Sequence, residues 1–188
     1  MEIEVSAEAK DKRLNRAVAI TVVALSVLMG LGNIKDGNIV QAMDQAKADS
    51  VDHWNEYQAT RTKAHIARTA RTEIAIIAAS PASAAAARPT LAGLDADIAK
   101  YTAEAPKIAA DAKAFADRYD ALNVHDDQFD ASEALLSTAI SVAAVAALVE
   151  SPWVLAVAWL FGLAGIVMSV CGFAALPFHP DILSTLLG

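Results

Sequence analysis

Two long apolar stretches without a charged residue, residues 134–149 and 151–178, follow Arg118, the last Lys or Arg of the chain. A third such stretch covers residues 17–34. An α-helix needs about 20 apolar residues to cross about 30 Å of hydrocarbon, and no other open backbone structure satisfies its hydrogen bonds there. The apolar fraction of 55% is also high for a soluble chain. The sequence therefore predicts a membrane protein with three crossings.

The charged residues are concentrated between the first two apolar stretches, in a polar segment long enough to form an independent helical unit. We therefore expect an all-α membrane protein with three transmembrane helices and a long extramembrane antiparallel helical hairpin, like a coiled coil, between the first and the second. The expected segments are a short cytoplasmic N-terminus (1–16), the first crossing (17–34), the hairpin (35–130), the second crossing (131–149), the third crossing (152–175) and an apolar interfacial tail (176–188).

Local signals mark the ends of the last two crossings. Asp130 and Glu133 favour the positive N-terminal end of a helix, and we expect the second crossing to begin there. Ser151 can cap a helix and Pro152 suits its first position, so a tight turn is expected between the last two crossings. Two tryptophans are the expected interface anchors of the third crossing: Trp153 and Trp159.

The charges around the first crossing predict its orientation. Basic residues are enriched on the cytoplasmic side of membrane helices, and four of them precede this crossing whereas only Lys35 follows it closely. We therefore expect a bacterial inner-membrane protein with a cytoplasmic N-terminus and a periplasmic hairpin. A cleaved secretory signal would also combine basic and apolar residues, but Gly30-Leu31-Gly32 is a poor cleavage site. The four basic residues are Lys10, Lys12, Arg13 and Arg16.

Glycine and proline divide the polar segment into two expected helices, residues 38–79 and 90–122. Gly37 is expected to interrupt the chain before the first helix, Pro81 to follow its end, and Pro89 to mark the start of the second. The tip of the hairpin is accordingly expected at residues 80–88.

The second hairpin helix carries an apolar seam with alternating spacings of three and four, which is typical of a coiled coil. Pro106 lies within this seam and is expected to kink the helix, because proline lacks a backbone donor. The seam residues are Leu91, Leu94, Ile98, Tyr101, Ala105, Ile108, Ala112, Phe115, Tyr119 and Leu122.

Small residues recur at intervals of four in the last two crossings, and such residues let helix backbones approach closely in lipid. They could join copies of the chain or pack the helices of one chain together. Three crossings alone leave much surface uncovered, so we expect a homo-oligomer in contact with membrane lipid. The small residues are Ala139, Ala143 and Ala147, Ala158 and Gly162, and Gly165 and Ser169.

Three segments carry a resemblance to a known family: residues 38–43 (NIVQAM), residues 52–59 (DHWNEYQA) followed by Lys63, and residues 126–134 (DDQFDASEA). With the terminal apolar hairpin, they resemble the bacterial membrane proteins catalogued as domain of unknown function 4337, over residues 13–173. The resemblance implies a membrane location. The turn between the last two helices is often basic in that family, whereas this chain has Glu150 there. The family carries no assigned reaction, so the resemblance implies no catalytic residues.

One candidate interaction site lies on the first hairpin helix, where aromatic, amide and basic side chains crowd together with Arg61 and His65 nearby. Such a cluster could bind a ligand or a lipid headgroup. The interpretation that the pattern favours is a polar seam in which Trp54 and Tyr57 pack on the other helix, as aromatic residues at helical spacing usually do. The candidate residues are His53, Trp54, Tyr57, Gln58 and Lys63.

A second candidate is a group of acids before the second crossing. In an oligomer these acids could form a ring that attracts cations to a pore mouth. Alternatively they cap the second membrane helix through its positive N-terminal end. The candidate acidic ring consists of Asp126, Asp127, Asp130 and Glu133.

Several function classes lack support in the sequence. No catalytic triad order, phosphate-binding glycine loop or metal-spaced Cys/His set occurs, so we expect no enzyme, cofactor or metal. With 22 acidic and 15 basic residues there is no reason to expect nucleic acid. The crossings carry no ionisable group at mid-bilayer, where coupled transport needs one. We expect an oligomeric scaffold that binds itself or another membrane protein. A passive ion or small-solute channel is the alternative, and a ligand sensor the third. The hydroxyls that could line such a channel are Thr21, Ser26, Ser137, Thr138, Ser141 and Ser169.

Overall fold

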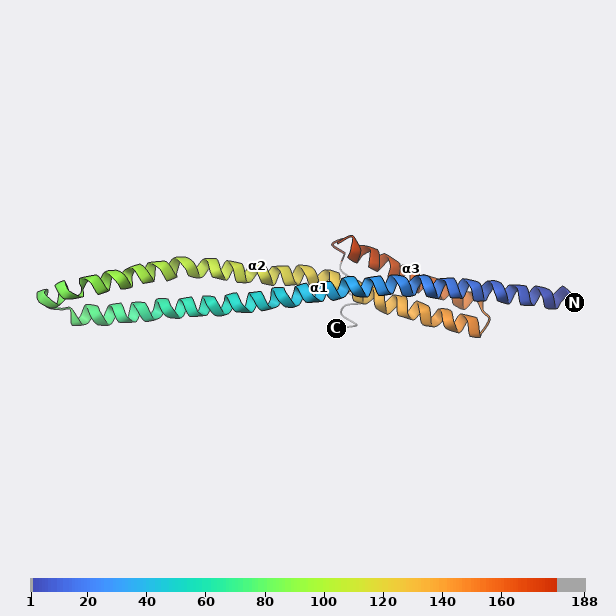
Figure 1. Cartoon of the computed structure of the whole chain (residues 1–188), viewed down its shortest axis with the longest axis horizontal. Coiled ribbons are helices and arrows are strands. Elements are labelled where there is room, and N and C mark those ends of the chain that lie inside the picture. Colours follow the sequence, from blue (N-terminus) through green and yellow to red (C-terminus); the bar gives the residue numbers. More distant parts are fainter. Residues whose placement is uncertain (1, 179–188) are drawn as a thin grey trace. The chain divides into compact units, whose positions relative to one another are not determined.

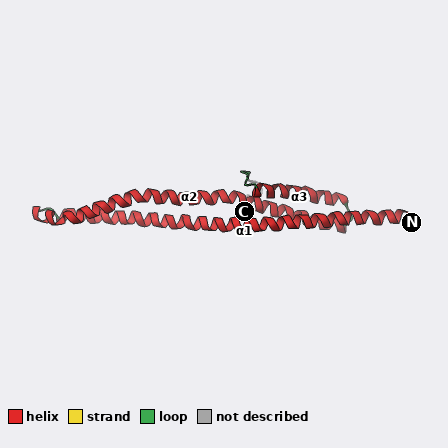
Figure 2. Cartoon of the chain, turned by 45° about the horizontal axis from the view of Figure 1, so that its top comes forward, coloured by secondary structure: helices red, strands yellow, loops and turns green. Residues whose placement is uncertain are grey.

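The computed structural model describes residues 2–178, with side chains from Lys12 onward. It contains three α-helices in the order α1 (Glu2–Ile77), α2 (Pro81–Leu148) and α3 (Pro152–Phe173). No β-strand occurs among the described residues, which confirms the predicted all-α class (Figure 2). Each helix contains a stretch long and apolar enough to cross a membrane. The predicted interfacial tail lies outside the described residues from position 179 onward.

Gly37 does not interrupt α1, so the predicted separation of the first crossing from the hairpin helix is wrong. The helix is continuous from Glu2 to Ile77. A single glycine inside a helix costs only about 1 kcal/mol relative to alanine. Ile39 and Met43, two and six residues later, are each only 6% exposed, and burial of their side chains stabilises the helix across this point.

The tip of the hairpin is shorter than predicted, because α2 begins at Pro81 and not after Pro89. Ser80 and Ser83 hold this start: the Ser83 backbone N–H donates to Ser80 Oγ at 3.2 Å, and the Ser80 N–H donates to Ser83 Oγ at 3.2 Å. Pro81 then occupies the first helical position, where proline's missing donor costs nothing. Pro89 lies within the helix.

α2 also continues without interruption from the hairpin into the second apolar stretch, so the predicted helix boundary between residues 122 and 131 is wrong. Pro106 lies inside this helix and leaves the Thr102 carbonyl without its usual helical donor. Figure 1 shows α2 curving away from α1 in the lime-green part that includes this region. The kink expected at Pro106 takes the form of a gradual bend.

The chain forms two compact units, which are described separately. The apolar unit comprises residues 1–43 and 120–188 and contains the first part of α1, the last part of α2, and α3. The hairpin unit comprises residues 44–119 and contains the remainder of α1 and α2 as an antiparallel pair. Within the hairpin unit the two helices run side by side (Figure 1).

Small residues hold the helices of the apolar unit close together. A methyl group added at Gly165 would lie 2.8 Å from Leu136 Cγ, and one added at Gly172 would lie 2.7 Å from Phe129 Cε2. The Ser132 hydroxyl bridges to α3, 2.9 Å from the Gly165 carbonyl oxygen and 2.6 Å from Ser169 Oγ. The small residues identified in the sequence thus pack helices of one chain: Ala139, Ala143, Ala158, Gly162, Gly165 and Ser169 are all buried.

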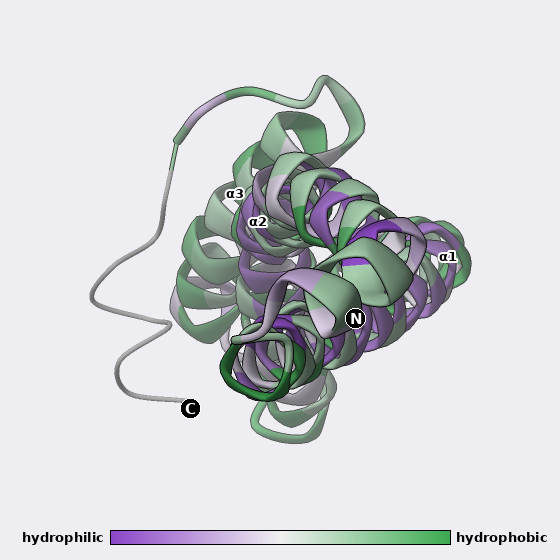
Figure 3. Ribbon diagram, turned by 90° about the vertical axis from the view of Figure 1, so that its left-hand side faces the viewer, coloured by the Kyte–Doolittle hydropathy of each residue, from purple (hydrophilic) through white to green (hydrophobic). Residues whose placement is uncertain are grey.

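The turn between α2 and α3 follows the prediction. Glu150 has a φ of 53°, which reverses the chain, and Pro152 begins α3. Ser151 occupies the N-cap position but makes no side-chain cap bond. Figure 3 shows α3 largely in green, the hydrophobic end of the scale. The predicted anchor Trp159 donates through Nε1 to Thr21 Oγ1 at 2.9 Å and thereby joins α3 to α1.

The hairpin unit has a narrow core made mostly of alanine. Ala46 and Ala112 are fully buried, and Ala64 and Ala67 are nearly so. Ser50, only 8% exposed, donates from Oγ to the Ala112 carbonyl oxygen at 3.0 Å. Alanine faces allow close helix packing but bury little apolar area, so polar contacts between the helices carry more of the specificity here than in the apolar unit.

Candidate functional site

An open groove of about 900 Å³ lies between α1 and α2 in the hairpin unit. Three basic or potentially basic side chains from α1 line it, together with two tyrosines, one from each helix. None of its twelve lining residues is acidic. The side chains that give the groove its chemistry are Arg61, His65, Arg68, Tyr57 and Tyr101.

The amino acids that flank the groove explain why it exists. Ala64, Ala105 and Ala109 line it with methyl groups only, so the two helices leave space that larger side chains would fill. Pro106 also lines the groove, and α2 bends in this region. The absence of bulky seam residues together with the proline therefore opens the hairpin at this level.

Arg61 lies against the Tyr57 ring at one wall. Its Cζ atom is 5.7 Å from the ring centroid, and its Nη1 atom is 3.5 Å from the tyrosine hydroxyl. Tyr57 in turn packs edge-on against Trp54, with ring centroids 5.5 Å apart. This stack holds the Arg61 guanidinium on the groove wall. The guanidinium has no acidic partner among the described residues.

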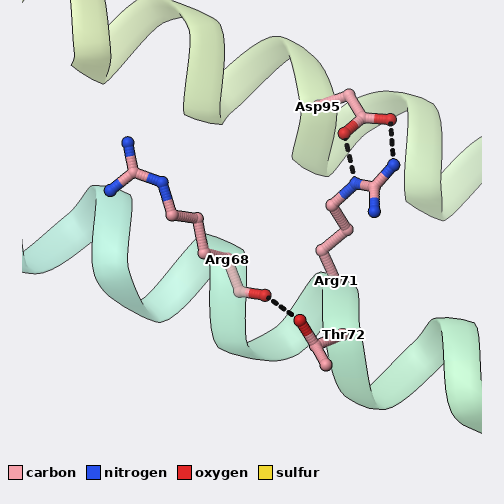
Figure 4. A network of polar contacts seen from close by, with 4 residues as sticks. All are labelled: Arg68, Arg71, Thr72 and Asp95. Carbon is pink, nitrogen blue, oxygen red and sulfur yellow. Dashed lines mark hydrogen bonds and ion pairs between the residues drawn. The ribbon is translucent and has the colours of Figure 1, made fainter.

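Arg68 and Arg71 lie one turn apart on α1 but have different partners. Arg71 forms a two-pronged ion pair with Asp95 of α2, in which Nη2 lies 3.3 Å from Oδ2 (Figure 4). Arg68 points away from this pair in Figure 4, and its Nη2 atom donates to Thr102 Oγ1 at 2.9 Å. Arg71 is therefore neutralised, whereas Arg68 brings its charge to the groove without an acidic partner among the described residues.

The candidate cluster predicted on α1 is only partly gathered at the groove. Tyr57 and Gln58 line it. Trp54 contacts Tyr57 but is 41% exposed, and it does not pack into the helix interface as the alternative interpretation required. His53 packs on Phe115, with ring centroids 5.1 Å apart, and Lys63 is exposed outside the groove lining.

The predicted acidic group lies within the apolar unit, where it meets an acid that the sequence analysis missed. Asp36 of α1 and Asp126 of α2 are hydrogen bonded through their carboxyls. Asn33 Nδ2 donates to Glu133 Oε1 at 3.4 Å, and Asn123 Nδ2 donates to Asp127 Oδ2 at 3.2 Å. Asp36 joins this cluster because α1 stays helical beyond the first apolar stretch.

Burial, followed by the charges of Asp36 and Asp130, together raise the pKa of Asp126 to about 7. Burial likewise raises the pKa of Asp36 and of Asp130. Oδ1 of Asp36 is buried without a hydrogen-bond donor among the described residues. A proton held by Asp126 relieves the repulsion between the two carboxyls.

The acids do not cap a helix, so that interpretation is wrong. They lie in the interior of α2, which runs from Pro81 to Leu148, and an N-terminal cap requires unpaired backbone donors. Among the described residues no group of three or more His, Cys, Asp or Glu is arranged to hold a metal ion. The pore-mouth hypothesis stays a prediction.

Most hydroxyls of the predicted pore lining have partners within the helices. Thr138 Oγ1 donates to the Ala134 carbonyl oxygen at 2.8 Å, and Ser141 Oγ donates to the Ser137 carbonyl oxygen at 2.9 Å. Thr21 accepts from Trp159, and Ser169 is buried against Ser132. These bonds are the ordinary use of Ser and Thr in membrane helices and require no water-filled pathway.

The sequence model of a domain of unknown function (DUF4337) matches residues 14–175. The chain belongs to this family. The DUF4337 match covers the groove, the acidic cluster and all three apolar stretches, and the family assigns no activity to any of them. No curated protein and no solved structure matches the chain.

Sequence reasoning identified one side of the groove and missed the other. Tyr57, Gln58, Arg61 and His65 stand out because they are close in sequence. Arg68, Tyr101 and Thr102 join them only through the register of α1 against α2, which no local pattern specifies. Pro106 was a usable signal, because a proline in a coiled-coil seam marks the place where packing is interrupted.

Proposed function

We propose that this DUF4337 protein is an integral membrane protein whose helical hairpin is an interaction surface, and that copies of the chain associate through it. We further propose a bacterial inner-membrane location with the N-terminus in the cytoplasm and the hairpin in the periplasm. The observation that carries the proposal is an exposed apolar face on the hairpin unit, on the side of α1 that faces away from α2.

The hairpin unit is a water-exposed segment by composition. Residues 44–119 contain ten acidic and ten basic side chains, so lipid cannot be what covers its apolar residues. Nevertheless, large apolar side chains on α1 are strongly exposed: Trp54 41%, Val51 52%, Ile66 61%, Ile76 70% and Ile77 77%. A contiguous apolar face in water usually marks a protein contact.

These apolar residues share one face of the helix. At 3.6 residues per turn they fall within about 140° of arc, roughly opposite the buried alanines of α1. Asn55 and Thr69 lie between them on the same face, and Glu73 is the one charged residue between positions 51 and 77 in this arc. A face with so little charge suits a helix of the same kind from a second copy, because a symmetric contact places the same face on both partners.

The first test is the mass of the particle extracted in mild detergent. An integer multiple of 19.7 kDa supports self-association. A particle of one chain overturns it, and additional mass from a different chain replaces the second copy with another membrane protein as the partner of the hairpin.

Cysteine crosslinking tests whether the apolar face is the contact. In a Cys171→Ser background, which removes the only native cysteine, Ile66→Cys is expected to give disulfide-linked dimers in membranes. Lys113→Cys is the matched control, because Lys113 is exposed on α2 and bonds only to Asp117 on its own helix. Equal crosslinking at both positions would show random collision and not a specific face.

A further inference from the structure

The groove of the hairpin unit has a chemistry distinct from that of the apolar face. We propose that it binds a small organic oxyanion attached to a flat ring, held by Arg61 and Arg68 at the anionic end and by Tyr57 and Tyr101 along the ring. This inference goes beyond the proposed interaction function and does not depend on self-association.

The charge balance at the groove favours an anion. The whole chain has a net charge of −7, and residues 44–119 contain equal numbers of acidic and basic side chains. Against this background the groove gathers Arg61, Arg68 and His65 and no acid. An unpaired guanidinium presents several N–H donors in one plane, and this arrangement matches two oxygens of a carboxylate or phosphate.

Arg71, which lies just outside the groove, has an acidic partner, whereas the arginines inside the groove have none among the described residues. Arg71, one turn beyond Arg68, already has Asp95 as a bidentate partner. Arg68 bonds only to the neutral hydroxyl of Thr102, and Arg61 only to the Tyr57 hydroxyl at the edge of hydrogen-bonding range. Both guanidinium groups therefore retain donors for an external anion.

The apolar part of the groove favours a ligand with a ring. Tyr57 and Tyr101 come from opposite helices, and Pro106 and Ala105 extend the apolar wall along α2. Tyrosine faces and proline pack well on flat aromatic groups. The volume of about 900 Å³ is within the range of small-molecule sites, so a ring with one anionic group fits.

The position along the chain favours a water-soluble ligand over a lipid headgroup. Residues 35–60 separate Arg61 from the first predicted crossing. That segment contains seven charged residues, five of them between positions 44 and 56, as expected for a part of the chain in water. A water-soluble ligand and a lipid headgroup can both carry the oxyanion. The experiment therefore tests a soluble probe and lipid vesicles separately.

Binding is measured by titration calorimetry on the full chain in detergent, with phenyl phosphate as the probe. Inorganic phosphate tests the contribution of the ring, and phenol tests the contribution of the charge. We expect phenyl phosphate to bind more tightly than either. Phenol binding as tightly as phenyl phosphate, or no detectable binding of phenyl phosphate, would overturn the proposal.

Four variants locate the site. Arg61→Gln and Arg68→Gln are each expected to weaken phenyl phosphate binding by about tenfold or more, because each removes a charge-assisted pair. Arg71→Gln is the matched control, with a change of less than about twofold expected for a residue outside the groove. Thr102→Val removes the Arg68 hydrogen bond but keeps the guanidinium, so binding is expected to persist even if the hairpin is less stable.

The pattern across these variants decides the proposal. Equal loss in Arg71→Gln and Arg68→Gln would indicate non-specific attraction to positive charge and would refute the site. Vesicles containing phosphatidylglycerol provide the lipid arm. If the Arg61-dependent interaction occurs only with these vesicles and never with phenyl phosphate, the groove is a lipid site and the assignment of a soluble ligand is wrong.

Discussion

The apolar unit and the hairpin unit are both built from α1 and α2, yet different contacts hold them together. In the apolar unit, glycine and serine bring the helices so close that Gly165 and Gly172 have no room for a methyl group. In the hairpin unit, alanines form a narrow core, and Ser50, Arg68 and Arg71 reach across to α2. The first is specified by shape and the second mainly by polar pairing.

This contrast has a consequence for where function can arise. A tightly packed helix bundle has no spare volume, whereas a hairpin joined by small residues and spaced polar contacts can open a groove between those contacts. The groove lies between the Ser50 contact with Ala112 and the Arg71 contact with Asp95 along α1. The weaker packing of the hairpin thus provides the space in which a ligand could bind.

The largest expected effect breaks the tight packing of the apolar unit. Gly172→Ala places a methyl group against the Phe129 ring, which Phe173 already holds edge-on with centroids 5.2 Å apart. Because Phe129 is only 3% exposed, its ring has little room to give way, and we expect a loss of about 1–3 kcal/mol in unfolding free energy, as for other overpacked cores. Chemical denaturation in detergent, followed by circular dichroism, measures it.

Gly30→Ala is the control for this prediction. Gly30 lies in the same unit, and nothing is within 4 Å of the position that its methyl group would occupy. We expect its stability to equal or slightly exceed that of the wild type. If Gly172→Ala has the same midpoint denaturant concentration as the wild type, the apolar unit adapts to the added volume. The difference in packing between the two units would then be smaller than described.

The second prediction concerns pH and the buried carboxyls of the apolar unit. Burial and neighbouring acids raise the pKa of Asp126 from the usual 3.8 to about 7 in the folded protein. Between these two values the folded state binds more protons than the unfolded state, so stability falls as pH rises. We expect Asp126→Asn to be more stable than the wild type above about pH 7 and to lose much of this pH dependence.

Hydrogen exchange at several pH values tests this prediction region by region. Exchange rates are first corrected for the intrinsic effect of pH. In the wild type, peptides from residues 20–43 and 120–140 should then exchange faster as pH rises. In Asp126→Asn they should not. Thr102→Val, in the hairpin unit, is the control and should retain the wild-type pH response in those peptides. A wild-type profile that is flat with pH would contradict the raised pKa of Asp126.

A pair of serine substitutions compares the same chemical change in both units. Ser132→Ala removes bonds to the Gly165 carbonyl and to the buried Ser169 hydroxyl, and we expect a cost of about 1 kcal/mol. Ser50→Ala removes one bond to a carbonyl that already belongs to a helix, with an expected cost of about 0.5 kcal/mol. The same denaturation assay measures both, and a larger effect for Ser50→Ala would reverse the ranking of the two units.

The sequence predicted the helical class and the apolar stretches, because both depend on local composition. It also predicted the turn at Glu150 and the start of α3 at Pro152, where the chain has strong local signals. It failed at Gly37 and Pro89, where local helix-breaking tendency was overcome: burial of Ile39 and Met43 stabilises α1, and Ser80 with Pro81 starts α2 earlier.

The candidate sites were less predictable because both combine residues from two helices. The acids from Asp126 to Glu133 were visible as a group, but Asp36 joins them only because α1 stays helical beyond the first apolar stretch. Arg68, Tyr101 and Thr102 required the register of the hairpin. Sequence patterns describe faces of single helices, and the pairing of faces is a property of the folded chain.

The last expected effect has the opposite sign to the first. Gly93 lies within α2 in the hairpin unit, with nothing within 4 Å of its potential methyl group. Gly93→Ala should stabilise the hairpin by about 0.5–1 kcal/mol, because alanine loses less conformational entropy on forming a helix. Slower hydrogen exchange in residues 85–100 would measure this gain. The same glycine-to-alanine change would then destabilise the apolar unit at Gly172 and stabilise the hairpin unit at Gly93, since close approach of the helices needs glycine only in the former. Destabilisation at Gly93 would instead reveal a contact on that face of α2, and a second copy of the chain would be the first partner to test there.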